Sequence, residues 1–318
     1  PPMSAFLALL DFSLGVTGPI FVLLGLGVLL RRVGLITEGF IAAGSRLVFV
    51  VGLPTMLFVN IARTRLEDSA SAGMLVYGLA ATVAIWLLME WVASFVVQPE
   101  RDRGVVVQGA FRSNFGVVGL AYCGNAYGEA GLAMASLYVG VLTILVNILG
   151  VITLSRSLHR SQGPGKVLRG IATNPLILGI LLALPVSAFA LPLPAVAMKS
   201  AAYIADMTLP LALLCTGATL DFRSLRSEAG NTALATFGKL VAMPLVFTLG
   251  AWAAGFRAME LGVLMLMASS PSAAASYSMV RAMGGNATLA ANIIALTTLG
   301  SLFTTSVGVS LLRGVGLM

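Results

Sequence analysis

Apolar residues gather in ten stretches along the chain, and each approaches the roughly 20 residues that an α-helix needs to cross a membrane. Short polar or basic segments separate the stretches, so the pattern predicts an all-α membrane protein with ten transmembrane helices. The predicted helices cover Leu14–Leu30, Thr37–Ala62, Ala72–Val97, Gly104–Tyr127, Ala130–Leu154, Gly170–Ala190, Ala195–Leu220, Asn231–Gly255, Met259–Met283 and Ala287–Leu312.

Polar residues interrupt two of these helices near their middle. In the ninth helix, Pro271 stands among four serines, and a proline inside a helix removes a hydrogen bond and clashes with the preceding turn. Backbone opened at membrane depth is tolerated only where protein or a watery cavity satisfies it. We therefore expect two broken helices, the second interruption being Arg112-Ser113-Asn114-Phe115-Gly116 in the fourth.

Matching residues recur between the two halves of the chain. Pro54 and Pro210 are 156 residues apart, and Ser113 recurs 157 residues later as Ser270. Because each half holds five helices, an odd number, the halves must have opposite orientations in the membrane. The sequence thus predicts inverted repeats over residues 1–154 and 170–318, joined by a short cytoplasmic linker at 155–169, with the fourth and ninth helices as symmetry mates.

An inverted repeat brings the two breaks together near the centre of the membrane. The first amides of each second half-helix lack partners within the helix, and the helix dipole places about +0.5 charge there. Two such ends favour an anion, above all a carboxylate. We expect the side chains of Asn114, Ser270 and Ser272 to add hydrogen-bond donors at this crossover.

Composition agrees with a membrane protein, since 58% of the residues are hydrophobic and only 10% are charged. The net charge of +7 would suggest nucleic acid as the partner of a soluble protein, but here the basic residues lie at the ends of apolar stretches. We expect no nucleic-acid partner. Eleven basic residues lie on one predicted side and five on the other, so the positive-inside rule places both termini outside.

Few residues are available for chemistry. The chain has one histidine, in a basic loop, and two cysteines, both in apolar stretches. No paired acids, zinc motif or nucleophile–base set is evident, so we expect neither an enzyme nor a metal or cofactor site.

Several motifs resemble the auxin efflux carrier family over nearly the whole chain. They are Phe111–Leu120 (FRSNFGVVGL), Asn174–Gly179 (NPLILG), Leu209–Leu214 (LPLALL), and Ser270–Ala273 (SPSA) followed by Gly284-Gly285-Asn286. The resemblance implies the inverted five-helix repeat of bile acid carriers and sodium/proton antiporters. Helices 1, 2, 6 and 7 would form a scaffold and homodimer side, and helices 3–5 and 8–10 a transport side with an elevator-like motion.

By the same resemblance, Asn114 matches the crossover asparagine of the plant PIN carriers and Pro271 their ninth-helix proline. Ser113 departs from the plant pattern, which has proline there. The linker is short, unlike the long loop of many plant members, which suggests a bacterial carrier in the plasma (inner) membrane. The expected substrate-binding residues are Asn60, Arg112, Ser113, Asn114, Phe115, Gly116, Thr216, Ser270, Pro271 and Ser272.

Some polar residues within the spans have two interpretations. Arg112 either pairs with the substrate or locks the crossover through an internal ion pair. Asp206 is either a proton-coupling residue or a cap before Pro210. For Glu90 and Lys239 we expect a structural ion pair.

The sequence therefore favours a secondary active transporter of small organic anions, such as malonate- or malate-like dicarboxylates or auxin-like acids. The substrate would bind at the crossover of helices 4 and 9. A sodium-coupled carrier of the bile acid type is the alternative, but it would need carboxylates or carbonyls near the crossover. A channel fits less well, because an inverted design suits alternating access.

Overall fold

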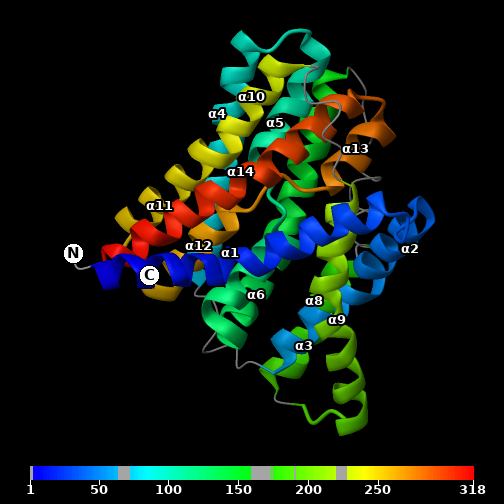
Figure 1. The fold of residues 1–318 in the computed structure, drawn as a ribbon, viewed down its shortest axis with the longest axis vertical. Coiled ribbons are helices and arrows are strands. Elements are labelled where there is room, and N and C mark those ends of the chain that lie inside the picture. Colours follow the sequence, from blue (N-terminus) through cyan, green and yellow to red (C-terminus); the bar gives the residue numbers. More distant parts are fainter. Residues whose placement is uncertain (1–2, 64–71, 159–172, 174, 190, 220–227) are drawn as a thin grey trace.

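The computed structural model describes the chain except residues 1–2, 64–71, 159–172, 174, 190 and 220–227, so most of the predicted linker lies outside the described residues. The described part is helical and contains no strand (Figure 1). Its α-helices are α1 (Met3–Arg32), α2 (Glu38–Leu47), α3 (Leu53–Ala62), α4 (Ala72–Val96), α5 (Arg103–Phe111), α6 (Leu120–Ser157), α8 (Pro175–Ala188), α9 (Ala195–Thr219), α10 (Ala229–Phe237), α11 (Met243–Ala253), α12 (Ala258–Ser269), α13 (Ala275–Met283) and α14 (Ala287–Gly314).

Length and hydropathy confirm an all-helical, multi-pass membrane protein. Six segments of the described chain are long and apolar enough to cross a membrane, and α8 and α12 provide shorter apolar helices. Helices occur at each of the ten predicted stretches, but ten crossings and an inverted repeat remain predictions. The six segments are Glu38–Ala62, Ala72–Val96, Phe115–Ser157, Ala195–Thr219, Ala229–Ala253 and Ala287–Gly314.

Short π-helical turns join several of these helices into longer spans. The turn η1 (Val48–Gly52) precedes Pro54, and η5 (Gly238–Ala242) precedes Pro244. Proline has no amide hydrogen to donate within the helix, and its ring crowds the carbonyl four residues earlier. The hydrogen bonds of the preceding turn therefore span five residues, as in a π-helix, rather than four. A third such turn, η4 (Phe115–Gly119), follows the predicted break in the fourth helix.

Helices α1 and α9 cross at a pair of glycines. A Cβ added at Gly27 would overlap the carbonyl oxygen of Leu214, and one added at Gly217 would overlap that of Leu24. The two backbones therefore touch directly, as small residues allow between membrane helices. This contact joins the first predicted helix of one half to the second of the other.

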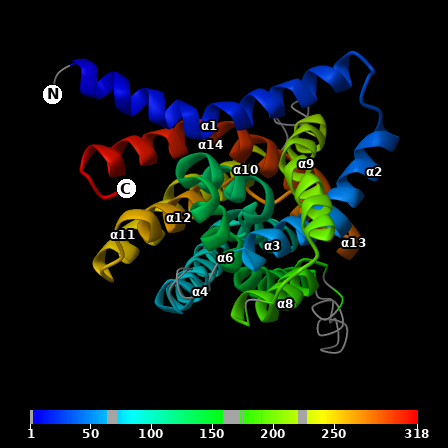
Figure 2. The same cartoon turned by 90° about the horizontal axis from the view of Figure 1, so that it is seen from below.

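The helices form two groups. Helices α1, α3, α8 and α9 pack on one another, whereas α4, α5, α6, α10, α11, α12 and α14 form the larger group (Figure 1). The expected division into a scaffold side and a transport side, and the motion of one relative to the other, remain predictions. Both termini lie at the same end of the molecule (Figures 1 and 2).

Candidate functional site

The two breaks meet and pair with each other. Helix α5 ends at Phe111 and helix α12 at Ser269, and the extended segments that follow form an isolated antiparallel bridge between Ser113 and Ser272. The amide of Asn114 donates to the carbonyl of Pro271 (2.7 Å), and the amide of Ala273 donates to the carbonyl of Arg112 (2.9 Å). Each break thus satisfies part of the other's backbone, as buried polar groups require.

Proline explains only one of the breaks. Ser270 has an extended backbone (φ −61°, ψ 145°), as expected of a residue before proline. The first break lacks a proline, yet Arg112 (φ −86°, ψ 95°) and Asn114 (φ −78°, ψ 60°) leave the helix. The bonds to Pro271 and Ala273 replace the helical bonds that this segment gives up.

The crossover serines are used internally, contrary to the expectation that Ser270 and Ser272 offer free donors. The Ser270 hydroxyl donates to the carbonyl of Met267 (2.8 Å), and the Ser272 hydroxyl donates to that of Gly109. Serine hydroxyls commonly bond nearby backbone in this way. These two serines hold the shape of the crossover.

Free donors nevertheless remain at the crossover. Ala273 and Ser276 donate to backbone carbonyls, but among the described residues no acceptor is found for the amides of Ala274 and Ala275. The same is true of the amides that begin the turn after the first break, those of Phe115 and Gly116. Both second half-helices therefore begin with unpaired donors at the positive end of the helix dipole.

The side chain of Asn114 is also available. It is 9% exposed, and no hydrogen-bond partner for its amide group lies within the described residues. Since buried amide groups normally have partners, this side chain is suited to a ligand.

Arg112 carries a buried positive charge beside Asn114. Its guanidinium donates to Asn147 Oδ1 on α6 (2.7 Å) and approaches Met279 Sδ on α13 (3.3 Å). The ion pairs found in the described part of the chain are Arg31–Glu38 and Arg103–Glu100, so the expected internal ion pair of Arg112 is absent there. A guanidinium has five N–H donors, and most of those on Arg112 are left for an anion.

The predicted ion pair of Glu90 and Lys239 is wrong. Glu90 accepts a hydrogen bond from Thr153 (2.7 Å). The fully buried Lys239 ammonium donates instead to Ser113 Oγ, to the carbonyl of Ala268 (2.9 Å) and to Met243 Sδ (3.0 Å). Lys239 therefore belongs to the crossover. The sequence signal for this role of Lys239 was the presence of a lysine inside an apolar stretch.

Three other expected residues lie outside this cluster of contacts. Asn60 on α3 donates to Ser136 on α6 (3.4 Å). Thr216 is half-buried on α9, and Asp206 is exposed on the same helix. Nothing in these contacts brings Asp206 to the crossover, and its role in coupling remains a prediction.

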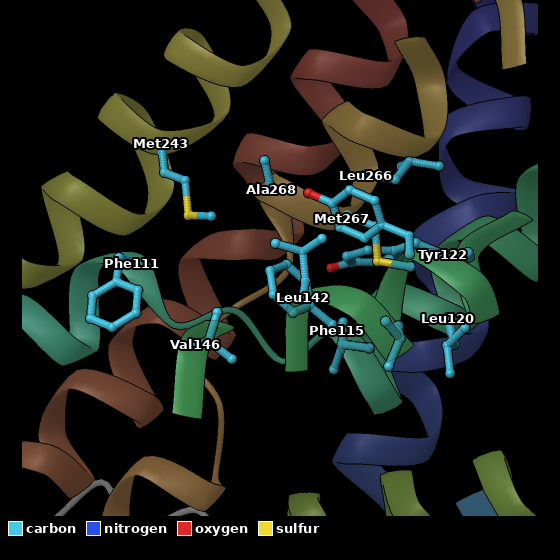
Figure 3. Close-up of a cluster of buried hydrophobic side chains, with 14 of the residues drawn as sticks. Phe111, Phe115, Leu120, Tyr122, Leu142, Val146, Met243, Leu266, Met267 and Ala268 are labelled. Carbon is cyan, nitrogen blue, oxygen red and sulfur yellow. The ribbon is translucent and has the colours of Figure 1, made fainter. Parts of the chain in front are cut away.

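Apolar side chains enclose the crossover. Figure 3 shows Phe111 and Phe115 at the two ends of the first extended segment, with Leu142 and Val146 of α6 beside it. Phe115 also packs edge-on against Tyr138, with ring centroids 5.8 Å apart. In such surroundings hydrogen bonds and charge interactions are stronger than in water. The free donors and Arg112 therefore act in a low-dielectric setting.

One hollow of the described structure has a different character. A cavity of about 610 Å³ lies between α4 and α6. Because its lining is entirely apolar, it does not suit an anion. The lining residues are Val76, Leu79, Ala80, Val83, Ala84, Leu87 and Leu145. No group of His, Cys, Asp or Glu that could hold a metal ion occurs among the residues described.

Comparison with known proteins identifies the family. An uncharacterized transporter of Methanothermobacter thermautotrophicus is 25% identical over 257 residues, which are 80% of this chain and 83% of the relative. The family described as membrane transport protein matches residues 17–309. The chain therefore belongs to this family of membrane transporters, which is the auxin efflux carrier family that its motifs resemble.

Proposed function

We propose that this membrane transporter is a secondary active carrier of small organic anions and binds a carboxylate at the crossover of its fourth and ninth helices. Substrates of malonate or malate type, or auxin-like acids, have the required chemistry. The carrier works as a homodimer in a bacterial plasma membrane, with both termini outside and an elevator-type motion of the larger helix group.

One observation carries the proposal: the two paired breaks both leave donors unpaired, and the buried guanidinium of Arg112 has no carboxylate partner in the described chain. The donors are the amides that begin η4 and α13 and the side chain of Asn114. Charge-assisted and bidentate hydrogen bonds from arginine to a carboxylate are among the strongest in proteins. A carboxylate offers acceptor oxygens to several of these donors at once.

A sodium-coupled carrier of the bile acid type is the second candidate. The bound cation of such a carrier needs oxygen ligands, and carbonyl oxygens at half-helix ends commonly provide them. Here Lys239 already donates to one such carbonyl, that of Ala268. We therefore expect transport that does not require sodium.

The test is a thermal-shift screen of purified protein over mono- and dicarboxylates, with the Asn114→Ala variant beside the parent. A carboxylate that binds the folded state should raise the melting temperature of the parent by mass action. Asn114→Ala should fold but lose most of this shift. Asn231→Ala is the matched control, since Asn231 donates to the Gln98 carbonyl (3.0 Å) at a helix end outside the crossover.

Two results would contradict the proposal. A parent protein that no carboxylate stabilises does not bind anions at this site. If a carboxylate binds Asn114→Ala and the parent equally, the binding site lies elsewhere.

A further inference from the structure

Lys239 is the most deeply buried charge at the crossover. It lies in η5, the π-turn between α10 and α11, and its side chain is 0% exposed. Burial of an ammonium is costly unless it is paired or hydrogen-bonded, and π-turns often occur at functional sites. The partners of Lys239 therefore define its role.

The partner on α12 is the negative end of a half-helix. The last four carbonyls of a helix have no partners within it, and the dipole places about −0.5 charge there. Met267 accepts from Ser270 and Ser269 accepts from Thr305, which leaves the carbonyl of Ala268 for Lys239. The helix end thus provides the counter-charge that a carboxylate would otherwise supply.

All three hydrogens of the ammonium are used. Besides Ala268, its partners are Ser113 Oγ in the first break and Met243 Sδ on its own span. Since an ammonium has three donors, none is left for a substrate. The ammonium joins the first break to the end of the helix that precedes the second.

We propose that the Lys239 ammonium is a covalently attached substitute for a bound alkali cation. Hydroxyl and half-helix carbonyl oxygens are the ligands that carriers use for coupling cations, and here a side chain of the chain itself occupies that position. The crossover is therefore assembled without a cation from solution. This proposal has two consequences, one for the stability of the fold and one for the affinity for substrate. Only the second rests on the proposed function, because the stability of the fold is measured without substrate.

The test is to remove the attached cation and supply a free one. Lys239→Ala and the parent are melted without substrate in the chloride salts of choline, sodium, potassium and n-propylammonium at equal ionic strength. We expect the variant to melt well below the parent in choline chloride and to recover most of the difference in sodium or n-propylammonium chloride. The parent should melt alike in all four salts.

Lys199→Ala is the matched control, because Lys199 is exposed on α9. It should show no cation-specific change. If a carboxylate ligand has been found, its affinity for Lys239→Ala should rise with the same cations. Since the melting experiment uses no substrate, it gives a result even if the protein binds no carboxylate.

The proposal is overturned if Lys239→Ala melts at the same temperature in all four salts. Should that variant fail to fold, Lys239→Arg and Lys239→Gln replace it. The arginine variant keeps the charge and should melt alike in all salts, whereas the glutamine variant should be stabilised by sodium. Equal behaviour of these two variants also overturns the proposal.

Discussion

Arg112 and Lys239 place two positive charges at one crossover but differ in the donors they have left. Lys239 uses its three hydrogens on Ser113, Met243 and Ala268. Arg112 has one oxygen partner, Asn147, and one weak sulfur partner. Because arginine presents a planar fork that fits a carboxylate, Arg112 is the cation suited to contact substrate.

The position of Arg112 depends on Gly150 of α6. A Cβ at residue 150 would lie 2.9 Å from Gln108 Nε2, which would have to move, and 3.4 Å from Arg112 Nη1, so it would crowd the guanidinium. Gly150→Ala should therefore weaken carboxylate binding about tenfold, or about 1.4 kcal/mol. Stability should fall little, because alanine favours a helix over glycine by roughly 0.5–1 kcal/mol.

Isothermal titration calorimetry with the ligand from the carboxylate screen measures this effect. Gly25→Ala is the control, since nothing lies within 4 Å of a Cβ placed there. Unchanged affinity in Gly150→Ala would mean that the guanidinium does not contact the substrate.

At the residue scale, the sequence predicted that the two breaks meet, but it missed Lys239 and did not predict how each residue is used. Arg112, Asn114 and Pro271 were identifiable from polar residues inside apolar stretches. The predicted ion pair of Lys239 with Glu90 was wrong because the prediction considered only charged side chains as partners. A carbonyl at a helix end also attracts a cation, and such an end exists only once α12 has stopped at Ser269.

At the element scale, hydropathy located the helices well because the membrane imposes one length on all of them. Even the boundary between the fourth and fifth predicted helices is visible within α6, where Gly128 has a non-helical backbone (φ 62°, ψ −144°). The second break followed from Pro271. The first break was expected from the polar residues Arg112 to Asn114 inside an apolar stretch, but the bonds to Pro271 and Ala273 that hold it open could not be derived from local sequence.

The crossing of α1 and α9 gives a prediction about helix packing. Gly27→Ala would push a methyl group into the backbone carbonyl of Leu214. Overpacking of this kind costs about 1–3 kcal/mol, so the variant should melt at a clearly lower temperature. Gly25→Ala, two residues away on the same helix, should melt like the parent.

Thermal denaturation in one detergent checks this pair. If Gly27→Ala and Gly25→Ala melt together, α1 and α9 do not make this contact in the protein.

At the scale of the whole molecule, both halves of the chain contribute to a polar cluster at one end of α5. The Asp102 carboxylate is 1% exposed, and one of its oxygens accepts from Asn286 (3.3 Å). Asn286 also donates to Glu228 (3.4 Å) and caps α14. Burial, and secondly the charge of Glu228, raise the pKa of Asp102 above its usual value, although the bond from Asn286 opposes this.

This shift predicts how stability depends on pH. Because the folded state binds the Asp102 proton more tightly than the unfolded state, stability falls as pH rises from the ordinary aspartate pKa, about 4, through the raised folded-state pKa. Asp102→Asn should remove this loss of stability. The loss amounts to about 1.4 kcal/mol for each unit by which the pKa of Asp102 in the folded state exceeds that in the unfolded state. The variant should melt higher than the parent at neutral pH.

Melting curves between about pH 4 and pH 8 provide the measurement. Glu129→Gln is the control, because Glu129 is exposed on α6. Identical pH profiles for the parent and Asp102→Asn would show that this carboxylate does not set the pH dependence.

The architecture of the whole chain was predictable only in part. Composition and span length indicate a multi-pass helical protein, and motifs indicate the family. Which helices pack together depends on contacts such as Gly27 with Leu214, which involve backbone and leave little trace in hydropathy. Substrate, coupling and dimerisation depend on surfaces and motions that a hydropathy pattern does not encode.

The antiparallel pairing of the two breaks has a consequence for how the protein is made. A chain enters the membrane from its amino-terminal end, so the fourth helix arrives long before the ninth. Until Pro271 and Ala273 are synthesised, the amide of Asn114 and the carbonyl of Arg112 lack the partners that they have in the finished protein. Unpaired backbone is costly in lipid. The first half must therefore stay in contact with water, or with the insertion machinery, until the second half completes it.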